Sequence, residues 1–275
     1  LDLSNKLKST KFIGYKHLAS ESKVNYIINN GKYVNEINNG EIGELIVKET
    51  PFYATSGGQV SDKGIIENSN FCAKIIECWK TKGDIIIHKV KVESGSLKVG
   101  QIVSMKVDVD NRKFTASNHS STHILHQALK DVLGDHISQK GSLVSSDRLR
   151  FDFSHPKSIT KSALLRVEEI INEKIRGNSE INIRQMSFKD SKKEGATALF
   201  GEKYSDIVRV VSMGEKLKNK RSYWSLELCG GTHVKRTGDI GILKIINESS
   251  ISSGVRRIEA ITGKDALNWI NEKNN

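Results

Sequence analysis

Two pairs of residues, each separated by four positions, carry the side chains of this sequence that could bind a metal ion. His119 and His123 form the first pair, and Cys229 and His233 form the second. Together they offer three imidazoles and one thiolate, a ligand set that suits a tetrahedral zinc site. Because the pairs lie far apart in the chain, the fold must bring two half-sites together.

The two half-sites differ in how strongly they indicate a metal. Histidines at i and i+4 lie on one face of a helix, but amphipathic helices also place histidines there by chance. The C-G-G-T-H segment at residues 229–233 is the stronger signal, because its glycines allow a tight turn between two ligands. We therefore expect a metal site, and the softness of thiolate and imidazole ligands favours zinc.

Two neighbouring residues limit the alternatives. His126 shares the helical face of His119 and is a rival ligand. Because the two pairs already supply four ligands, we interpret His126 as a histidine that hydrogen-bonds beside the site. Ser120 stands where the metalloprotease pattern H-E-x-x-H needs its glutamate, so a peptidase is disfavoured. Four protein ligands normally make a closed structural site, whereas catalysis needs a displaceable position, and the spacing leaves both open.

Hydrophobic periodicity predicts the elements that position these pairs. Apolar residues recur at helical spacing over residues 115–133, and Gly134 is well placed to end that helix. The second pair follows a strand-like segment at residues 225–228. Further predicted elements of the second half are strands at 149–153, 181–184, 207–211, 240–246 and 255–261 and a helix at 160–176.

These patterns predict an α+β fold with two domains. Residues 1–110 contain short β-branched runs punctuated by glycines, which favours a small β-barrel, with a hairpin turn at 81–84. Residues 111–262 combine two helices with a predominantly antiparallel sheet, which predicts a two-layer α+β domain containing the zinc site. Residues 263–275 read as the start of a linker helix.

The composition describes an ordinary globular protein. The chain has 275 residues, of which 37% are hydrophobic and 27% charged. No apolar stretch is long enough to span a bilayer and no signal core opens the chain, so we expect a cytoplasmic protein without a membrane partner. Cys72 and Cys78 lack C-x-x-C spacing, and we expect buried reduced thiols on one side of a strand.

The net charge of +11 favours a polyanionic partner such as a nucleic acid. The positive residues are spread along the whole chain, so solvated surface lysines explain the charge equally well. The first residue is Leu1 rather than methionine, and we therefore expect a processed chain or a segment cut from a longer protein.

Several segments of the sequence resemble one protein family. They are T-P-F-Y-A-T-S-G-G-Q-V at 50–60, S-N-H-S-S-T-H-I-L-H at 117–126, S-Q-K-G-S-L-V at 138–144, R-L-R-F-D-F-S-H at 148–155, G-A-T-A-L-F-G-E-K-Y at 195–204, C-G-G-T-H at 229–233 and S-G-V-R-R-I-E-A at 253–260. In this order they resemble the editing domain of alanyl-tRNA synthetases, with its N-terminal barrel, and the related free-standing AlaX trans-editing proteins. The resemblance runs from about Phe12 to Gly263, and the small departures at Ser61 and Thr197 touch no metal ligand.

The resemblance implies hydrolysis of tRNA(Ala) that has been mischarged with serine or glycine. It implies that the two opening pairs hold Zn²⁺ and that Thr122 and Gln139 line the amino-acid pocket as catalytic residues. The residues expected to contact the substrate or the acceptor end of tRNA(Ala) are Gly57, Gly58, Gln59, Arg148 and Arg150.

Each of these assignments has a local alternative. Thr122 could bond back to a helix carbonyl, and Gln139 could be a solvated loop residue. Gly57-Gly58-Gln59 invites comparison with release factors, yet a glycine-rich barrel turn with Gln59 or Asp62 as a structural group is also consistent. Arg148 and Arg150 could be phosphate contacts or solvated strand charges.

The implied chemistry needs little covalent machinery. An aminoacyl-tRNA ester is already activated, so hydrolysis needs a positioned water and stabilisation of the oxyanion. Zinc could activate that water or hold the substrate's amine or hydroxyl, and four protein ligands favour holding. A pocket that admits serine also admits alanine, so discrimination must come from polar contacts to the serine hydroxyl.

Three other interpretations stay open. The first is a free-standing AlaX-type protein. The second is a threonyl-tRNA synthetase editing domain, which uses similar ligand pairs, although the segments at 50–60 and 148–153 favour the alanine system. The third is a non-catalytic RNA-binding module with structural zinc. Adenylate-forming class II motifs are absent from the sequence, so we expect no aminoacylation by this chain and, for a fragment, parent synthetase domains in cis.

Overall fold

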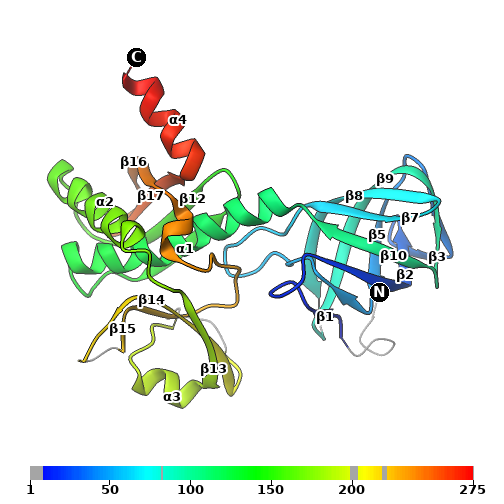
Figure 1. Cartoon of the computed structure of the whole chain (residues 1–275), viewed down its shortest axis with the longest axis horizontal. Coiled ribbons are helices and arrows are strands. Elements are labelled where there is room, and N and C mark those ends of the chain that lie inside the picture. The colour runs from blue at the N-terminus through cyan, green and yellow to red at the C-terminus, as the bar shows by residue number, and fades with distance from the viewer. Residues whose placement is uncertain (1–8, 82, 199–203, 219–221, 275) are drawn as a thin grey trace. The chain divides into compact units, whose positions relative to one another are not determined.

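The computed structural model describes residues 9–81, 83–198, 204–218 and 222–274 (Figure 1). These residues divide into two compact units. The barrel unit comprises the described residues up to 56 together with 60–112, and the α+β unit comprises 57–59 and those from 113 onward. The α+β unit thus takes in a short segment that the sequence assigns to the barrel domain. Among the described helices, none combines the length and apolar character needed to cross a membrane.

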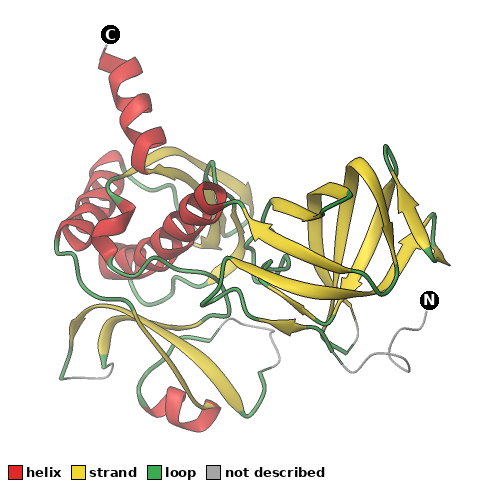
Figure 2. Ribbon diagram, turned by 45° about the vertical axis from the view of Figure 1, so that its right-hand side comes forward, coloured by secondary structure: helices red, strands yellow, loops and turns green. Residues whose placement is uncertain are grey.

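Strands of the barrel unit close on themselves, which confirms the predicted small barrel (Figure 2). Around the barrel run β10 (Ile102–Val107), β7 (Gly64–Asn68), β8 (Phe71–Thr81), β9 (Ile85–Lys98), β5 (Ile42–Val47) and β2 (Ala19–Asn29). Antiparallel pairing of β2 with β10 completes the circle. The flanking strands are β1 (Lys11–Phe12), β3 (Lys32–Val34), β4 (Glu36–Asn38) and β6 (Glu49–Thr50).

The β8–β9 hairpin corrects the expectation for two cysteines. The pairing of β8 with β9 contains irregularities between Cys72 and Ala73 and between Ile75 and Glu77. A bulge adds a residue to one strand and shifts its alternation, so six residues no longer return to the same face. Cys78 is fully buried, whereas Cys72 is only half-buried. Both are free thiols, but their predicted placement on one side of the strand is wrong.

His88 is a fully buried histidine of the barrel unit. Its Nδ1–H donates to the carbonyl oxygen of Leu45 at 3.1 Å, and its Nε2 accepts from the hydroxyl of Thr50 at 2.8 Å. The Thr50 hydroxyl oxygen accepts in turn from the amide of Phe52. Burial lowers the pKa of His88 from 6.5 to about 4. The hydrogen bonds and the pKa both describe a neutral imidazole.

The barrel should therefore lose stability in mild acid. Between pH 6.5 and about 4, unfolding allows His88 to bind a proton that the folded barrel excludes, so the free energy of unfolding falls as the pH falls. The slope approaches about 1.4 kcal/mol per pH unit, for a total of about 3 kcal/mol. Urea unfolding between pH 7 and pH 5 should show a flatter dependence for His88→Gln than for the wild type. Parallel curves would contradict this account.

Helix α1 (Val109–Leu133), which carries the first ligand pair, begins earlier than predicted. A carboxylate oxygen of Asp108 accepts the amide N–H of Asn111 at 3.0 Å and so caps the helix. The first turn is polar and has no apolar periodicity, which is why the sequence shows a helix only from Thr115. Gly134, with φ of 111°, follows the helix end as predicted.

The α+β class of the second unit is confirmed, but its strands form two sheets (Figure 1). The larger sheet has the order β11 (Gln139–Val144), β12 (Leu149–Ser154), β17 (Val255–Thr262) and β16 (Leu243–Ser252). The smaller one has the order β13 (Asn182–Ser187), β14 (Ile207–Lys216) and β15 (Tyr223–Leu228). The other helices are α2 (Lys161–Arg176), α3 (Phe188–Lys193), α4 (Gly263–Asn274) and a short 3₁₀ helix, η1 (Thr237–Ile240). Alternation in the sequence shows which residues face inward, but not which strands pair.

A single large core joins both sheets to the central helix. Side chains from α1, α2, the larger sheet and strands β14 and β15 contribute to it. Phe151 and Phe153 of β12 are fully buried there beside Leu125 and Leu129 of α1. Burying each such side chain contributes roughly 1.5–3 kcal/mol, so the unit has a substantial apolar core apart from any metal.

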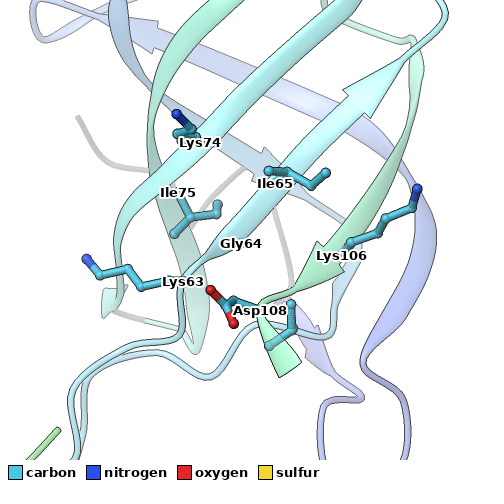
Figure 3. A pocket seen from close by; sticks show the side chains of 8 residues that line it. Lys63, Gly64, Ile65, Lys74, Ile75, Lys106 and Asp108 are labelled. Atoms are coloured by element: carbon cyan, nitrogen blue, oxygen red, sulfur yellow. The ribbon is translucent and has the colours of Figure 1, made fainter. Parts of the chain in front are cut away.

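A surface pocket of about 410 Å³ lies on the barrel unit (Figure 3). It is lined by Lys63, Gly64, Ile65, Lys74, Ile75, Lys106, Val107 and Asp108. Lys74 pairs with Glu93 at 3.3 Å and Lys106 with Glu67 at 2.6 Å, while Lys63 donates to a backbone carbonyl. Carboxylates therefore offset the charges of Lys74 and Lys106, whereas the carbonyl partner of Lys63 is neutral.

Candidate metal centre

The middle of helix α1 is buried on all sides, although one of its faces is polar. Every residue from 115 to 129 is buried. An amphipathic helix normally turns its polar face to water, because burying polar groups without partners is unfavourable. Here the polar face carries His119, Ser120, Thr122, His123 and His126, and nearby residues supply hydrogen bonds to it. The buried polar face is therefore where the site lies.

The structure brings the two predicted ligand pairs together. His119 and His123 come from α1, while Cys229 and His233 follow strand β15, and one ligand atom from each lies within 4.8 Å of all the others. The rings of His119 and His123 stack one helical turn apart, with centroids separated by 5.3 Å and planes at 14°. The ring of His233 completes the group at 4.6 Å and 5.1 Å from the other two.

The spacing of the ligand atoms suits a tetrahedral ion. Cys229 Sγ lies 3.4 Å from Nε2 of His119 and 3.4 Å from Nε2 of His233. Tetrahedral zinc with its usual bond lengths, about 2.3 Å to sulfur and 2.0–2.1 Å to nitrogen, separates such ligand atoms by about 3.5 Å. The cluster could thus hold a metal ion, and its donors are those that zinc prefers.

Gln59 orients the first histidine ligand. Its amide oxygen accepts from Nδ1 of His119 at 2.7 Å and from the backbone N–H of Thr232 at 2.9 Å. Its amide nitrogen donates to the Thr232 hydroxyl at 2.9 Å. The side chain is fully buried, and these bonds hold both ends of the amide. These contacts agree with a structural role for Gln59, one of the two alternatives that the sequence left open. Its contact with substrate stays a prediction.

Ser120 holds another ligand. Its hydroxyl oxygen accepts the backbone N–H of Val234 at 3.2 Å and lies 3.2 Å from Nδ1 of His233. The serine that replaces a metalloprotease base is therefore part of the scaffold around the ligands. Both contacts join helix α1 to the turn after β15.

His126 lies outside the ligand cluster. Its Nδ1 lies 2.6 Å from a carboxylate oxygen of Glu227, and the other oxygen of Glu227 lies 2.6 Å from Nδ1 of His123. His126 is therefore a histidine beside the site rather than a fifth ligand. No motif in the sequence indicated Glu227, although it lies two residues before Cys229 on a strand that ends at Leu228, a spacing that would place both side chains on one face if the extended backbone continued.

Electrostatics at the cluster favour a cation. Burial opposes the Cys229 thiolate, yet His119, His123 and His233 together hold the pKa of this thiol well below its usual range. Burial also opposes a charge on His123, but Glu227 and Cys229 raise its pKa to about 10. His233, desolvated and beside other imidazoles, has a pKa lowered to about 3. The Cys229 thiolate and the Glu227 carboxylate thus carry two negative charges against one positive charge on His123, and this excess of negative charge suits a divalent metal.

The two residues expected to line the amino-acid pocket lie on different elements. Thr122 is buried on α1, and its hydroxyl donates to the carbonyl of Asn118 at 2.9 Å, as the local alternative expected. That bond uses its proton and leaves the oxygen able to accept another. Gln139 begins β11 and is half-buried, with a long 3.5 Å contact from its amide nitrogen to the hydroxyl of Ser142.

The Gly57-Gly58-Gln59 segment packs against β11. The carbonyl of Gly58 accepts the amide of Val144 at 2.8 Å. Gly58 has φ of 83°, and a Cβ there would lie 2.0 Å from the hydroxyl of Ser142, so only glycine fits. The close approach brings Gln59 to the ligand turn.

Asp62, the other residue proposed for a structural role, has one. It forms a buried ion pair with Arg112 and accepts the amide of Tyr53 at 2.6 Å. Both contacts lie within the barrel unit.

The predicted arginine contacts to tRNA lie on strand β12. Arg148 approaches Glu259 at 3.7 Å and Arg150 approaches Asp152 at 3.6 Å. Both guanidinium groups are partly exposed and already lie near carboxylates, so their contact with phosphate stays a prediction. Residues 199–203 of the G-A-T-A-L-F-G-E-K-Y segment lie outside the described residues.

Comparisons with known proteins first define the class. A model of class II (A) tRNA synthetases matches residues 1–111, and a model of the second additional domain of threonyl and alanyl tRNA synthetases matches residues 208–259. Comparisons along nearly the whole of this chain then give alanine--tRNA ligases. The alanine--tRNA ligase of Rhodopseudomonas palustris is 49% identical over 267 residues, which cover 96% of this chain and 30% of the relative. That of Listeria welshimeri is 46% identical over 273 residues, covering 99% and 30%.

The class is therefore that of the aminoacyl-tRNA synthetases. Within it, the chain belongs to the alanyl-tRNA synthetase family, as the sequence segments indicated. The chain spans about 30% of the length of the curated relatives it matches.

Gly231 provides a test of the site's packing. A Cβ at this position would lie 2.0 Å from Cε1 and 2.3 Å from Nδ1 of His119, and 2.8 Å from the amide oxygen of Gln59. Gly231→Ala should displace His119 and weaken Zn²⁺ binding by about 10-fold or more, since displaced ligand supports typically cause such losses. Competition with a chromophoric chelator measures the affinity. Gly177→Ala, where a Cβ meets only ordinary contacts, should bind Zn²⁺ like the wild type. Equal affinity in both variants would contradict the packing argument.

Proposed function

We propose that this chain is the editing region of an alanyl-tRNA synthetase and hydrolyses Ser-tRNA(Ala) and Gly-tRNA(Ala). The observation that carries the proposal is the convergence of three imidazoles and a thiolate on the buried polar face of α1. The match to the second additional domain of threonyl and alanyl synthetases, at 208–259, includes Cys229 and His233. The relatives at 46–49% identity support the alanine system over the threonine system.

The partner in this proposal is the acceptor end of tRNA(Ala). The net charge of +11 is consistent with binding a polyanion. Arg148 and Arg150 are the proposed phosphate contacts. Further domains of the relatives, which are about three times as long, would act in cis. A cytoplasmic location and the lack of aminoacylation by this chain are part of the proposal.

The substrate approaches from the less buried side of the cluster. His119 and His123 are buried, while Cys229 and His233 are half-buried and Gly230 is exposed. When bound, zinc supplies a Lewis acid that can hold the substrate's amine or hydroxyl. Because the chain itself supplies four ligands, we propose that the site positions the ester rather than generating a hydroxide.

Discrimination against alanine is assigned to hydrogen bonds. The Thr122 hydroxyl donates to Asn118, so toward a substrate its oxygen is an acceptor. A serine hydroxyl can donate to that oxygen, whereas the methyl group of alanine cannot. Gln139, whose amide makes a long contact to Ser142, is the second proposed polar contact to the substrate.

The central experiment compares deacylation of Ser-, Gly- and Ala-tRNA(Ala) by the isolated chain. We expect hydrolysis of the first two and sparing of the third, together with no charging of tRNA(Ala) with alanine. Removal of zinc by a chelator should abolish hydrolysis and leave the apolar core folded, as followed by circular dichroism. Cys229→Ala should reduce hydrolysis by at least about 100-fold through loss of a ligand. Cys72→Ala, which changes a half-buried thiol of the barrel unit, should have no effect.

The alternatives predict different outcomes of the same assays. A preference for Ser-tRNA(Thr) over Ser-tRNA(Ala) would indicate the threonine system. Melting of the α+β unit on chelation, with tRNA binding but no hydrolysis by the metal-loaded chain, would indicate an RNA-binding module with structural zinc.

Thr122 allows a sharper test of specificity. Thr122→Val keeps the shape of the side chain and removes the hydroxyl, so hydrolysis of Ser-tRNA(Ala) should fall by about 10- to 100-fold, the equivalent of a lost buried hydrogen bond. Hydrolysis of Gly-tRNA(Ala) should change much less, because glycine has no hydroxyl. Thr115→Val is the matched control on the same helix, since the Thr115 hydroxyl is buried without a hydrogen-bond partner. Equal losses for the serine and glycine esters would exclude the proposed role.

A further inference from the structure

Glu227 is a buried acid with two imidazole partners. It lies on β15 and is only 6% exposed. One carboxylate oxygen lies 2.6 Å from Nδ1 of His123, and the other lies 2.6 Å from Nδ1 of His126. His123 is one of the four clustered ligands, whereas His126 is not. A single carboxylate therefore links a ligand to a histidine that cannot reach the metal cluster.

We propose that Glu227 is a positioning residue of the metal centre and that His126 acts through it. The proposal rests on the metal site of the function proposed above, and it concerns how the ligand His123 is held. A carboxylate accepts hydrogen bonds, so Nδ1 of His123 carries the proton that it donates to Glu227. The lone pair of the ring is then on Nε2, which faces the other ligands. The opposite tautomer would present an N–H group to the ion and could not bind it.

His126 fixes the orientation of the carboxylate. His123 and His126 are three residues apart on one face of α1, so each can take one oxygen of Glu227. The His126 ring is buried and tilts against Phe151 at a centroid distance of 5.2 Å, which limits its own movement. Without the N–H of His126, one buried oxygen would lose its partner and the carboxylate could rotate away from His123.

Glu227 also balances charge. The Cys229 thiolate and the Glu227 carboxylate together carry two negative charges, which match a divalent cation bound by neutral imidazoles. Replacing the carboxylate with a neutral group would leave a net positive charge in a buried site, which is unfavourable. Glu227 therefore contributes both orientation and charge.

The first experiment uses Glu227→Gln and Glu227→Leu. Glutamine keeps the volume and can accept from His123 with its single oxygen, but its NH₂ group cannot accept from His126, so it removes the charge and one of the two hydrogen bonds. Leucine removes the charge and both hydrogen bonds. Zn²⁺ affinity, measured by chelator competition, should fall by about 10- to 100-fold for glutamine and further for leucine. With Co²⁺ as the probe, the absorption bands that report thiolate ligation and tetrahedral geometry should shift in folded Glu227→Leu.

A matched control removes a carboxylate from the neighbouring strand. Glu215 on β14 pairs with Lys174 at 2.8 Å and contacts none of the ligands. Glu215→Gln should retain wild-type Zn²⁺ affinity and the wild-type Co²⁺ spectrum. A purely structural role for Glu227 would alter unfolding but leave the Co²⁺ spectrum of the folded variant unchanged.

The second experiment tests whether His126 acts through Glu227. His126→Phe keeps a ring against Phe151 and removes the N–H donor, so it should weaken Zn²⁺ binding while Glu227 and all four ligands remain. Combined with Glu227→Leu, it should add no further loss, because the two residues act in sequence. Additive losses in the double variant would exclude the link. If Glu227→Leu does not fold, Glu227→Gln and His126→Phe decide the question.

Failure of this proposal differs from failure of the proposed function. Wild-type Zn²⁺ affinity and an unchanged Co²⁺ spectrum in Glu227→Gln and His126→Phe would overturn the role of Glu227, whatever the deacylation assays show. A wild-type chain that binds Zn²⁺ without hydrolysing any mischarged tRNA(Ala) would contradict the proposed function alone.

Discussion

Two buried negative charges, on Cys229 and Glu227, determine how the α+β unit is arranged around its site. Both groups lie on one face of β15 and its continuation, and neither can be buried without positive or hydrogen-bonding partners. Those partners are histidines on α1, with His233 of the turn after β15 as a further partner of Cys229. The helix must therefore lie against the three-stranded sheet with its polar face inward, and the apolar core covers its remaining surface. The central position of α1 follows from satisfying these charges.

The sequence predicted the ligands because their local geometry is simple. Four-residue spacing places His119 and His123 on one helical face, and the glycines after Cys229 allow a tight turn. The barrel and the α+β class were also predictable, since strand alternation and helical periodicity are properties of single segments. The pairing of strands from different segments could not be predicted in this way. The sequence does not show that β13, β14 and β15 leave the other strands to form their own sheet, or that bulges turn Cys72 away from Cys78.

The residues that surround the ligands were not predictable for a related reason. Gln59 is far from His119 in the chain, and only the folded structure shows that its amide oxygen accepts from that ring. Glu227 lacks a motif of its own, and a glutamate on a strand is usually a solvated residue. Its role depends on two histidines that are contributed by another element. Hydrogen-bond partners of a ligand are specified by tertiary contact, whereas ligands themselves are often specified by spacing.

The four ligand side chains differ in how they are held by neighbouring residues. This difference affects how the site can work. Each imidazole has its Nδ1 beside a buried side chain, from Gln59, Glu227 or Ser120. Apart from its contacts with Nε2 of His119 and His233, Cys229 Sγ accepts a backbone amide, that of Gly231 at 3.3 Å, and it lies on the less buried side of the cluster. Three firmly oriented imidazoles make a rigid platform that resists rearrangement during a reaction. In the proposed function, a substrate would arrive on the side of the exposed Gly230. Under the proposed function, the three firmly held imidazoles suit a metal that keeps its protein ligands while it holds and orients the ester.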